Sequence, residues 1–284
     1  MEDRDIIFLT ETHESPGRGL PRVQGYVWES THRKCMRKHT TRGSEGVAVL
    51  YKHGLQDKIQ ILVHDPEACF MWIRVELHKG HFAYNALCYF APSGERFATV
   101  GEDTTGGATV EQEGEEEGDT LSPYTCLTEK IMEYSSLGEI FLMGDFNGQT
   151  QSKQCETYDF EDPEALHPLD EVGVDRISTN TTTPTAYGRH LLHLGSQHRL
   201  VIYNGMAQWP GSGDLTCIPP STPGGGSTVD YIMGSREASH MLTSLTIQPT
   251  PIGADHSYIT LSLDSSHTRR TVSTHYHTFY PCTI

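Results

Sequence analysis

The sequence lacks the features of a membrane or secreted protein. Its 284 residues contain no apolar run near the roughly 18 residues that cross a bilayer. The apolar stretch Ile6–Leu9 is too short for a signal peptide. The seven cysteines form no C-x-x-C pair, which argues against a disulfide framework or a zinc site. We therefore expect an intracellular protein, nuclear or cytoplasmic, that makes no contact with a membrane.

Basic residues are missing from two segments, and this absence explains the net charge of −16. Residues 101–119 and residues 155–175 each contain eight acids and no Lys or Arg. Removing these 16 acids leaves 21, which equals the number of Lys and Arg residues. The remainder of the chain is neutral, so the net charge does not exclude a nucleic-acid partner. We interpret residues 101–119 as a flexible acidic insertion in one domain, 1–264, and residues 265–284 as a C-terminal tail.

Short apolar segments rich in β-branched and aromatic residues dominate the chain, and helical periodicity occurs twice. Helices are predicted over 123–137, with Leu127, Ile131 and Tyr134 on one face, and over 187–198. Strands are predicted over 5–12, 46–52, 58–64, 70–77, 82–90, 139–145, 200–203, 214–218, 228–233, 245–248 and 258–263. Strands interleaved with a few helices indicate a layered α/β (α+β) domain.

Four of these strands have polar or acidic residues at one end. The residues concerned are Glu11, Asp145 with Asn147, Asp230, and Asp255 with His256. An apolar strand anchors a carboxylate rigidly at the edge of a sheet. Converging carboxylates favour a hard divalent cation such as Mg²⁺, and a His beside an acid can supply a proton or stabilise charge. Each segment alone is also compatible with an ordinary solvated turn.

In their order and context, these residues resemble the motifs of the endonuclease/exonuclease/phosphatase superfamily, which includes DNase I and the AP endonucleases. Thr10–His13 matches its metal-binding Glu motif, and Tyr89–Pro92 matches its Tyr motif. The G-D-F-N motif is intact at 144–147, S-x-V-D-Y spans 227–231, and the closing S-D-H motif is present at 254–256 with Ala in place of Ser. The resemblance implies a DNase I-like, four-layer α-β-β-α sandwich with two mixed sheets.

A finer resemblance points to the endonuclease domains of LINE-type retrotransposons. Their G-x-x-LL-x-L helix, L-x-I-x-N-G strand and T-C element are matched at 188–194, 200–205 and 216–217. Asp175–Ser178 is similar to their R-x-S element. Family members carry an Asn-bearing strand before the Glu strand. In this sequence the Glu strand comes first, so we expect the fold to lack its first strand.

The resemblance implies a metal-dependent phosphodiester hydrolase, namely a DNA-nicking endonuclease of retrotransposon origin. It implies Glu11 as the main ligand of Mg²⁺, with Mn²⁺ as a possible replacement, and Asp255 as support for the metal or the His. The implied partner is DNA, and no obligate protein partner is evident from the sequence.

The resemblance also implies a role for each of five catalytic residues. Asp145 would orient or deprotonate the attacking water, and Asn147 would position that carboxylate. Tyr89 would donate a hydrogen bond to a phosphate oxygen. Asp230 would orient His256, which would stabilise the charge that develops in the transition state.

Two other interpretations stay open. One is a phosphatase that acts on an inositol phosphate or another small phosphoester, and the other is a truncated, catalytically inactive remnant that lacks the Asn strand. A basic segment between the first predicted strands favours DNA, because Lys and Arg bind phosphates; it contains Arg33, Lys34, Arg37, Lys38 and Arg42. The same segment is equally compatible with a solvated loop.

Overall fold

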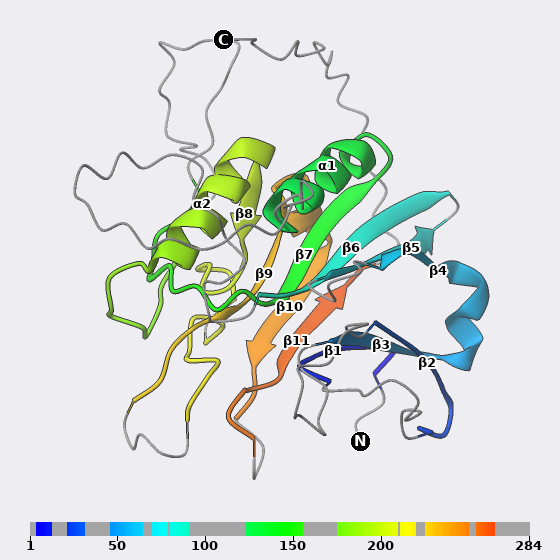
Figure 1. Ribbon diagram of the computed structural model, residues 1–284, viewed down its shortest axis with the longest axis horizontal. Helices are drawn as coiled ribbons and strands as arrows, with labels where there is room; N and C mark the ends of the chain where they lie inside the picture. The colour runs from blue at the N-terminus through cyan, green and yellow to red at the C-terminus, as the bar shows by residue number, and fades with distance from the viewer. Residues whose placement is uncertain are drawn as a thin grey trace, which may run out of the picture.

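The computed structural model of the protein describes residues 4–12, 22–31, 46–64, 70–78, 80–90, 123–155, 175–209, 211–219, 225–249 and 254–264. These ranges form layers of strands and helices around two hydrophobic clusters (Figure 1). The predicted acidic insertion and C-terminal tail lie outside the described residues, as do the five bases of the basic segment.

A six-stranded mixed sheet forms the centre of the molecule. In spatial order its strands are β4 (Ile59–His64), β5 (Phe70–His78), β6 (His81–Tyr89), β7 (Glu139–Asp145), β9 (Asp230–Ser235) and β8 (Leu200–Ile202). β6 and β7 are parallel, and the other neighbouring pairs are antiparallel. A parallel pair needs a crossover connection, and α1 (Pro123–Ser135) lies in it.

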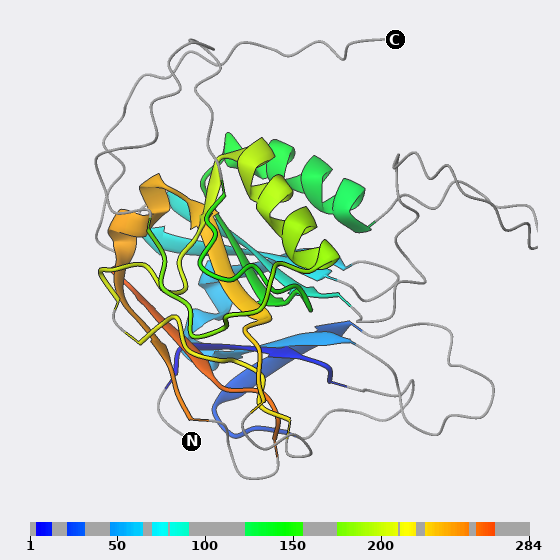
Figure 2. The ribbon, with the colours of Figure 1, turned by 90° about the vertical axis from the view of Figure 1, so that its left-hand side faces the viewer.

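Both α-helices cover one face of the central sheet (Figure 2). α1 buries Leu127 and Ile131 against this face, as its helical periodicity predicted. α2 (Ala186–His198) buries Leu191 and Leu194 in the same cluster. Burial of these apolar stripes holds the helices in place.

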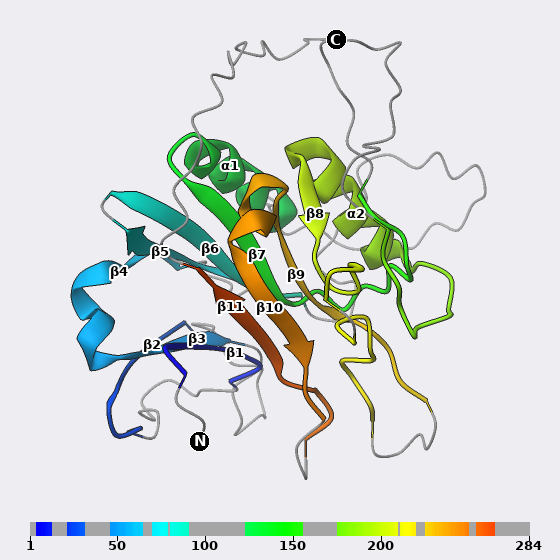
Figure 3. The same ribbon diagram turned by 180° about the vertical axis from the view of Figure 1, so that it is seen from behind.

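Two small antiparallel sheets cover the opposite face of the central sheet (Figure 3). The three-stranded sheet has the order β1 (Ile6–Thr10), β3 (Val47–Lys52) and β2 (Tyr26–Thr31). The two-stranded sheet pairs β10 (Leu242–Ile247) with β11 (Ile259–Leu263). Two 3-10 helices, η1 (His53–Lys58) and η2 (Glu237–Met241), precede β4 and β10. The two small sheets pack on the central sheet and enclose the second hydrophobic cluster between them.

The predicted fold class is confirmed, with four differences in detail. The second β layer consists of two separate antiparallel sheets, because β1 and β11 each pair with a single neighbour. The predicted strand 214–218 contributes only isolated bridges, because Cys217 pairs with both Ser227 and His256. β2 was not predicted. Both α-helices of the described ranges lie on one side, so those ranges contain three of the four predicted layers.

Candidate active site

The ends of three neighbouring central strands bring Tyr89, Asp145 and Asp230 into one row. Tyr89 lies opposite Asp145 in the β6–β7 pair, and Asp145 lies opposite Asp230 in the β7–β9 pair. Residues directly opposite each other in a sheet share a face. Asp145 and Asp230 are only 2% and 9% exposed, so two buried carboxylates stand side by side.

The G-D-F-N segment holds the Asp145 carboxylate in a fixed orientation. Gly144 has a φ of +130°, and a Cβ there would lie 2.0 Å from the carbonyl oxygen of Cys88, so a glycine is required. The Asn147 backbone N–H donates to Asp145 Oδ1 at 2.8 Å, and Asn147 Nδ2 donates to Asp145 Oδ2 at 2.9 Å. Asn147 Nδ2 also donates to the Phe90 carbonyl at 2.7 Å. Asn147 thereby positions Asp145 relative to the end of β6.

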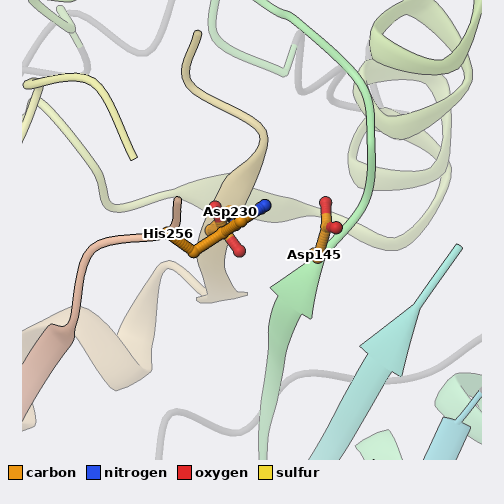
Figure 4. A group of neighbouring side chains, drawn as sticks. All are labelled: Asp145, Asp230 and His256. Atoms are coloured by element: carbon orange, nitrogen blue, oxygen red, sulfur yellow. Dashed lines mark hydrogen bonds and ion pairs between the residues drawn. The ribbon is translucent and has the colours of Figure 1, made fainter. Parts of the chain in front are cut away.

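His256 reaches Asp230 from outside the central sheet. Its Nδ1 lies 2.9 Å from Asp230 Oδ2, and Figure 4 shows the two side chains together beside Asp145. The bridge between Cys217 and His256 fixes the backbone of His256. Thr216 fixes Asp230 in turn, because its hydroxyl accepts from the backbone N–H of Val229 and of Asp230. No role was predicted for Thr216, although the T-C element at 216–217 is the sequence signal that could have identified it.

Glu11 and Tyr89 connect the three-stranded sheet to this row. Tyr89 Oη donates to Glu11 Oε1 at 2.7 Å. Glu11 follows β1 directly and has a φ of +51°. This is the left-handed region of the backbone, which few residues other than glycine adopt. The carboxylate of Glu11 contributes to the electrostatics of Asp145, so the two groups share one acidic region.

Burial and crowding shift the proton affinities of the central pair. Burial first, and then the adjacent Asp230 carboxylate, raise the pKa of Asp145 to about 8. The hydrogen bond from His256 to Asp230 raises the pKa of His256 to about 9. His256 is therefore an imidazolium at neutral pH, and Asp145 retains its proton there unless an opposite charge binds nearby.

The chain matches a known family over most of its length. The model of the endonuclease/exonuclease/phosphatase family matches residues 2–256. The chain belongs to the endonuclease/exonuclease/phosphatase family. Members of this family are hydrolytic nucleases and phosphatases that generally use divalent metal ions. A search of curated proteins found no match.

Two solved structures with TM-scores above 0.5 share the fold of this chain. The AP endonuclease LMAP from Leishmania major superposes with a TM-score of 0.58 at 14% identity, covering 92% of this chain and 78% of that chain. The 3′ phosphatase NExo from Neisseria, bound to a product DNA hairpin, has a TM-score of 0.53 at 16% identity and covers 92% and 89%. The endonuclease domain of TRAS1, a telomere-specific non-LTR retrotransposon, also matches, with a TM-score of 0.45 at 12% identity over 83% and 80%.

The donor set of the site fits the divalent cation used by the family. Asp145, Asp230 and His256 each have an oxygen or nitrogen atom within 4.8 Å of the others, and the two aspartates supply oxygen donors. In the described part of the chain, neither Asp145 nor Asp230 forms an ion pair with a Lys or Arg. Carboxylate oxygens are the ligands that Mg²⁺ prefers. A divalent cation would also lower the pKa of Asp145 and so favour its ionised form.

The predicted site residues fall into three groups. Asp145, Asn147, Asp230, His256 and Tyr89 meet at one rim of the central sheet, with Glu11 hydrogen-bonded to Tyr89. The Asp255 side chain is exposed, and the backbone carbonyl of Asp255 accepts from the N–H of Ile218. The basic segment lies outside the described residues, so its contact with DNA stays a prediction.

None of the helices in the described ranges combines the length and apolarity needed to cross a membrane.

The pKa shifts of the site predict how thermal stability depends on pH without divalent cations. Asp145 has a folded pKa of about 8 against an ordinary 3.8, so the folded state binds its proton more tightly. His256 is raised to about 9 from 6.5 by its partner Asp230. Both groups therefore stabilise the fold at low pH, and their contributions are lost as pH rises from about 4 to 8 and from about 6.5 to 9.

Scanning calorimetry in EDTA is the appropriate measurement for these two contributions. Relative to the wild type, Asp145→Asn is expected to remove the decrease in Tm between pH 4 and 8, and His256→Gln the decrease above pH 6.5. If Tm depended on pH in the same way in the wild type and in both variants, the raised pKa values of Asp145 and His256 would be contradicted.

Proposed function

We propose that the protein is a metal-dependent phosphodiester hydrolase that nicks DNA. The observation that carries this proposal is the convergence of Asp145 with the Asp230–His256 pair at adjoining strand ends. Glu11 and Tyr89 flank the same rim. A carboxylate with a raised pKa beside an imidazolium gives the site one group that accepts a proton and one that stabilises negative charge.

The geometry supports a distinct role for each side chain. Asp145, held by Asn147, would orient the attacking water and accept its proton. His256, held by Asp230, would stabilise the charge that develops on the phosphate oxygens. Tyr89, whose hydroxyl donates to Glu11 in the free protein, would donate to one of these oxygens instead. A bound divalent cation would supply Lewis-acid stabilisation of the phosphate, with Glu11 as its main oxygen ligand and Asp255 as outer support.

DNA is the proposed substrate for two reasons. The sequence resembles LINE-type endonuclease domains, which implies a nick with 3′-hydroxyl and 5′-phosphate ends. The five bases between 33 and 42 would attract the phosphate backbone, although the acidic segments of the chain oppose this attraction. A retrotransposon origin follows from the same resemblance and is part of the proposal.

Plasmid nicking tests this proposal directly. Supercoiled plasmid incubated with the protein and Mg²⁺ or Mn²⁺ is expected to become open-circular, and EDTA is expected to prevent the reaction. Inositol polyphosphates are assayed in parallel for phosphate release. Phosphate release with intact plasmid would favour the small-phosphoester phosphatase instead. Inactivity on both substrates, in a folded sample, would favour the inactive remnant.

Replacement of Tyr89 by Phe tests whether its hydroxyl contacts the substrate. Loss of one hydrogen bond to a charged phosphate is expected to lower kcat about tenfold, with little change in Tm. Tyr84→Phe is the matched control, because Tyr84 lies on the same strand but faces the helix side and stacks on Tyr134. Equal kcat values for the two variants in a nicking time course would exclude this role.

A further inference from the structure

Arg176 is a buried cation that joins two segments next to the site. Its side chain is 5% exposed. Its Nε donates to the Asn204 carbonyl at 2.7 Å, in the turn after β8. Its Nη1 donates to Thr150 Oγ1 at 3.2 Å and to the Lys153 carbonyl, both in the loop that follows Asn147. The guanidinium thus holds this loop against the turn.

Both segments continue by direct hydrogen bonds to the strand that carries Asp230. The backbone N–H and the hydroxyl of Thr150 donate to Tyr231 Oη at 3.1 and 3.2 Å. Asn204 Oδ1 accepts from the Ile232 N–H at 2.8 Å, and Asn204 Nδ2 donates to the Asp230 carbonyl at 3.3 Å. The first three residues of β9, Asp230 to Ile232, are therefore hydrogen-bonded to Thr150 and Asn204, which Arg176 holds.

Arg176 lies behind the site rather than in it. Tyr231 belongs to the hydrophobic cluster on the helix side of the central sheet, and the Arg176 guanidinium lies 5.8 Å from its ring centre. Ile232, the next residue of β9, faces the small sheets. Because alternate residues of a strand point to opposite faces, Asp230 shares the side of Ile232. Arg176 therefore supports the strand from the face opposite to the carboxylates.

Stability alone does not explain an arginine at this position. In the described ranges no carboxylate pairs with Arg176, and its Nη2 atom is buried without a hydrogen-bond partner. A buried charge without a counter-ion costs stability, and an apolar side chain of similar volume avoids that cost. The advantage of arginine is geometric, because its planar fork fixes several acceptors at set directions.

We propose that Arg176 is a positioning residue, which sets the separation between Asp145 and the Asp230–His256 pair by locking the loop after Asn147 onto the start of β9. The expected effect on catalysis rests on the proposed function. The expected effect on the geometry of the Asp230–His256 pair does not depend on any activity. Lysine keeps the charge but cannot replace the fork, so charge alone does not satisfy this role.

Arg176→Lys and a matched control variant test the proposal. Arg176→Lys is expected to lower kcat for plasmid nicking about 10- to 100-fold with an unchanged KM. The control is Arg189→Lys, because Arg189 is an exposed residue of α2 that also donates to a backbone carbonyl, that of Pro184. Arg189→Lys is expected to keep wild-type values. A loss of activity that only follows a fall in Tm, or a change in KM alone, would overturn the proposal.

Two further measurements remain decisive if the lysine variant folds poorly or the wild type cleaves nothing. The low-field NMR signal of the His256 Nδ1 proton, which lies in the bond to Asp230, reports the geometry without turnover. It is expected to move or broaden in Arg176→Lys and in Tyr231→Phe, and to stay unchanged in Arg189→Lys. If the signal is unchanged in the first two variants, Arg176 has no positioning role. Guanidinium added to Arg176→Ala is expected to restore the signal. If it does not, the claim that the planar guanidinium group positions these segments is contradicted.

Discussion

Replacing Asp145 with asparagine is expected to lower kcat for DNA nicking by about 10²–10⁴-fold, the contribution of a positioned general base. The amide keeps the shape of the carboxylate and can still accept a hydrogen bond from Asn147, but it cannot take a proton from water. The same change is expected to raise Tm at neutral pH, because burial and the adjacent Asp230 disfavour in the fold the ionised form of Asp145 that the unfolded chain adopts there, and an amide carries no such penalty. Activity and stability should therefore change in opposite directions.

The measurement pairs single-turnover nicking with a thermal melt of the same sample in EDTA. Asp57→Asn is the control, because Asp57 is an exposed acid of η1, and it is expected to change neither quantity. If Asp145→Asn kept wild-type activity, the attacking water would have to be activated elsewhere. If the variant lost both activity and stability, Asp145 would be a structural residue.

Replacing Asp230 with asparagine is expected to reduce kcat at pH 8 by about 30-fold through His256, the ratio of its protonated fractions at pKa values of about 9 and 6.5. The carboxylate raises the pKa of His256 to about 9 by accepting its hydrogen bond. Without the negative charge this pKa falls toward the ordinary 6.5, and the imidazolium that stabilises transition-state charge is lost at working pH. The alkaline limb of the pH–rate profile should therefore move down from near 9 toward 6.5.

A pH–rate profile with saturating substrate tests this shift, and the activity of Asp230→Asn at pH 6 is the informative point. Partial recovery at low pH is expected, because His256 is then protonated without help. A uniform loss of activity at every pH would instead show that Asp230 acts directly, for example as a metal ligand. His256→Gln should lose the alkaline limb altogether.

The strands that carry the site could be predicted because their local sequence determines them. Glu139–Asp145 was predicted with its observed bounds, since a continuous apolar run that ends in Gly and Asp fits a buried strand and its termination. The segment 214–218 has similar β propensity but is not a strand, because its hydrogen bonds go to two different partners. β2 was missed, and all but its last residue are only half-buried, so it lacks the strong alternation of a core strand.

The properties of the site that depend on distant contacts could not be predicted. The motifs identified Asp145, Asp230 and His256, but the raised pKa of Asp145 requires its burial and its register opposite Asp230. The connection of Arg176 to Thr150 joins residues 26 positions apart across a segment outside the described residues. Nothing in local periodicity indicates such a contact, since side-chain networks are set by tertiary packing.

The site combines groups from three parts of the layered fold, namely Glu11, the Asp145–Asp230 pair and His256. In the described ranges no β-ladder joins these three parts. Glu11 follows the three-stranded sheet, the aspartates end central strands, and His256 precedes β11. Sheets that share no β-ladder open separately, so amide hydrogens of β1 and β11 should exchange with solvent faster than those of β6 and β7. A ligand that binds all three groups at once would link the three-stranded, central and two-stranded sheets to one another. Its binding should slow exchange in the two outer sheets far more than in the centre, because each opening event would then have to release the ligand.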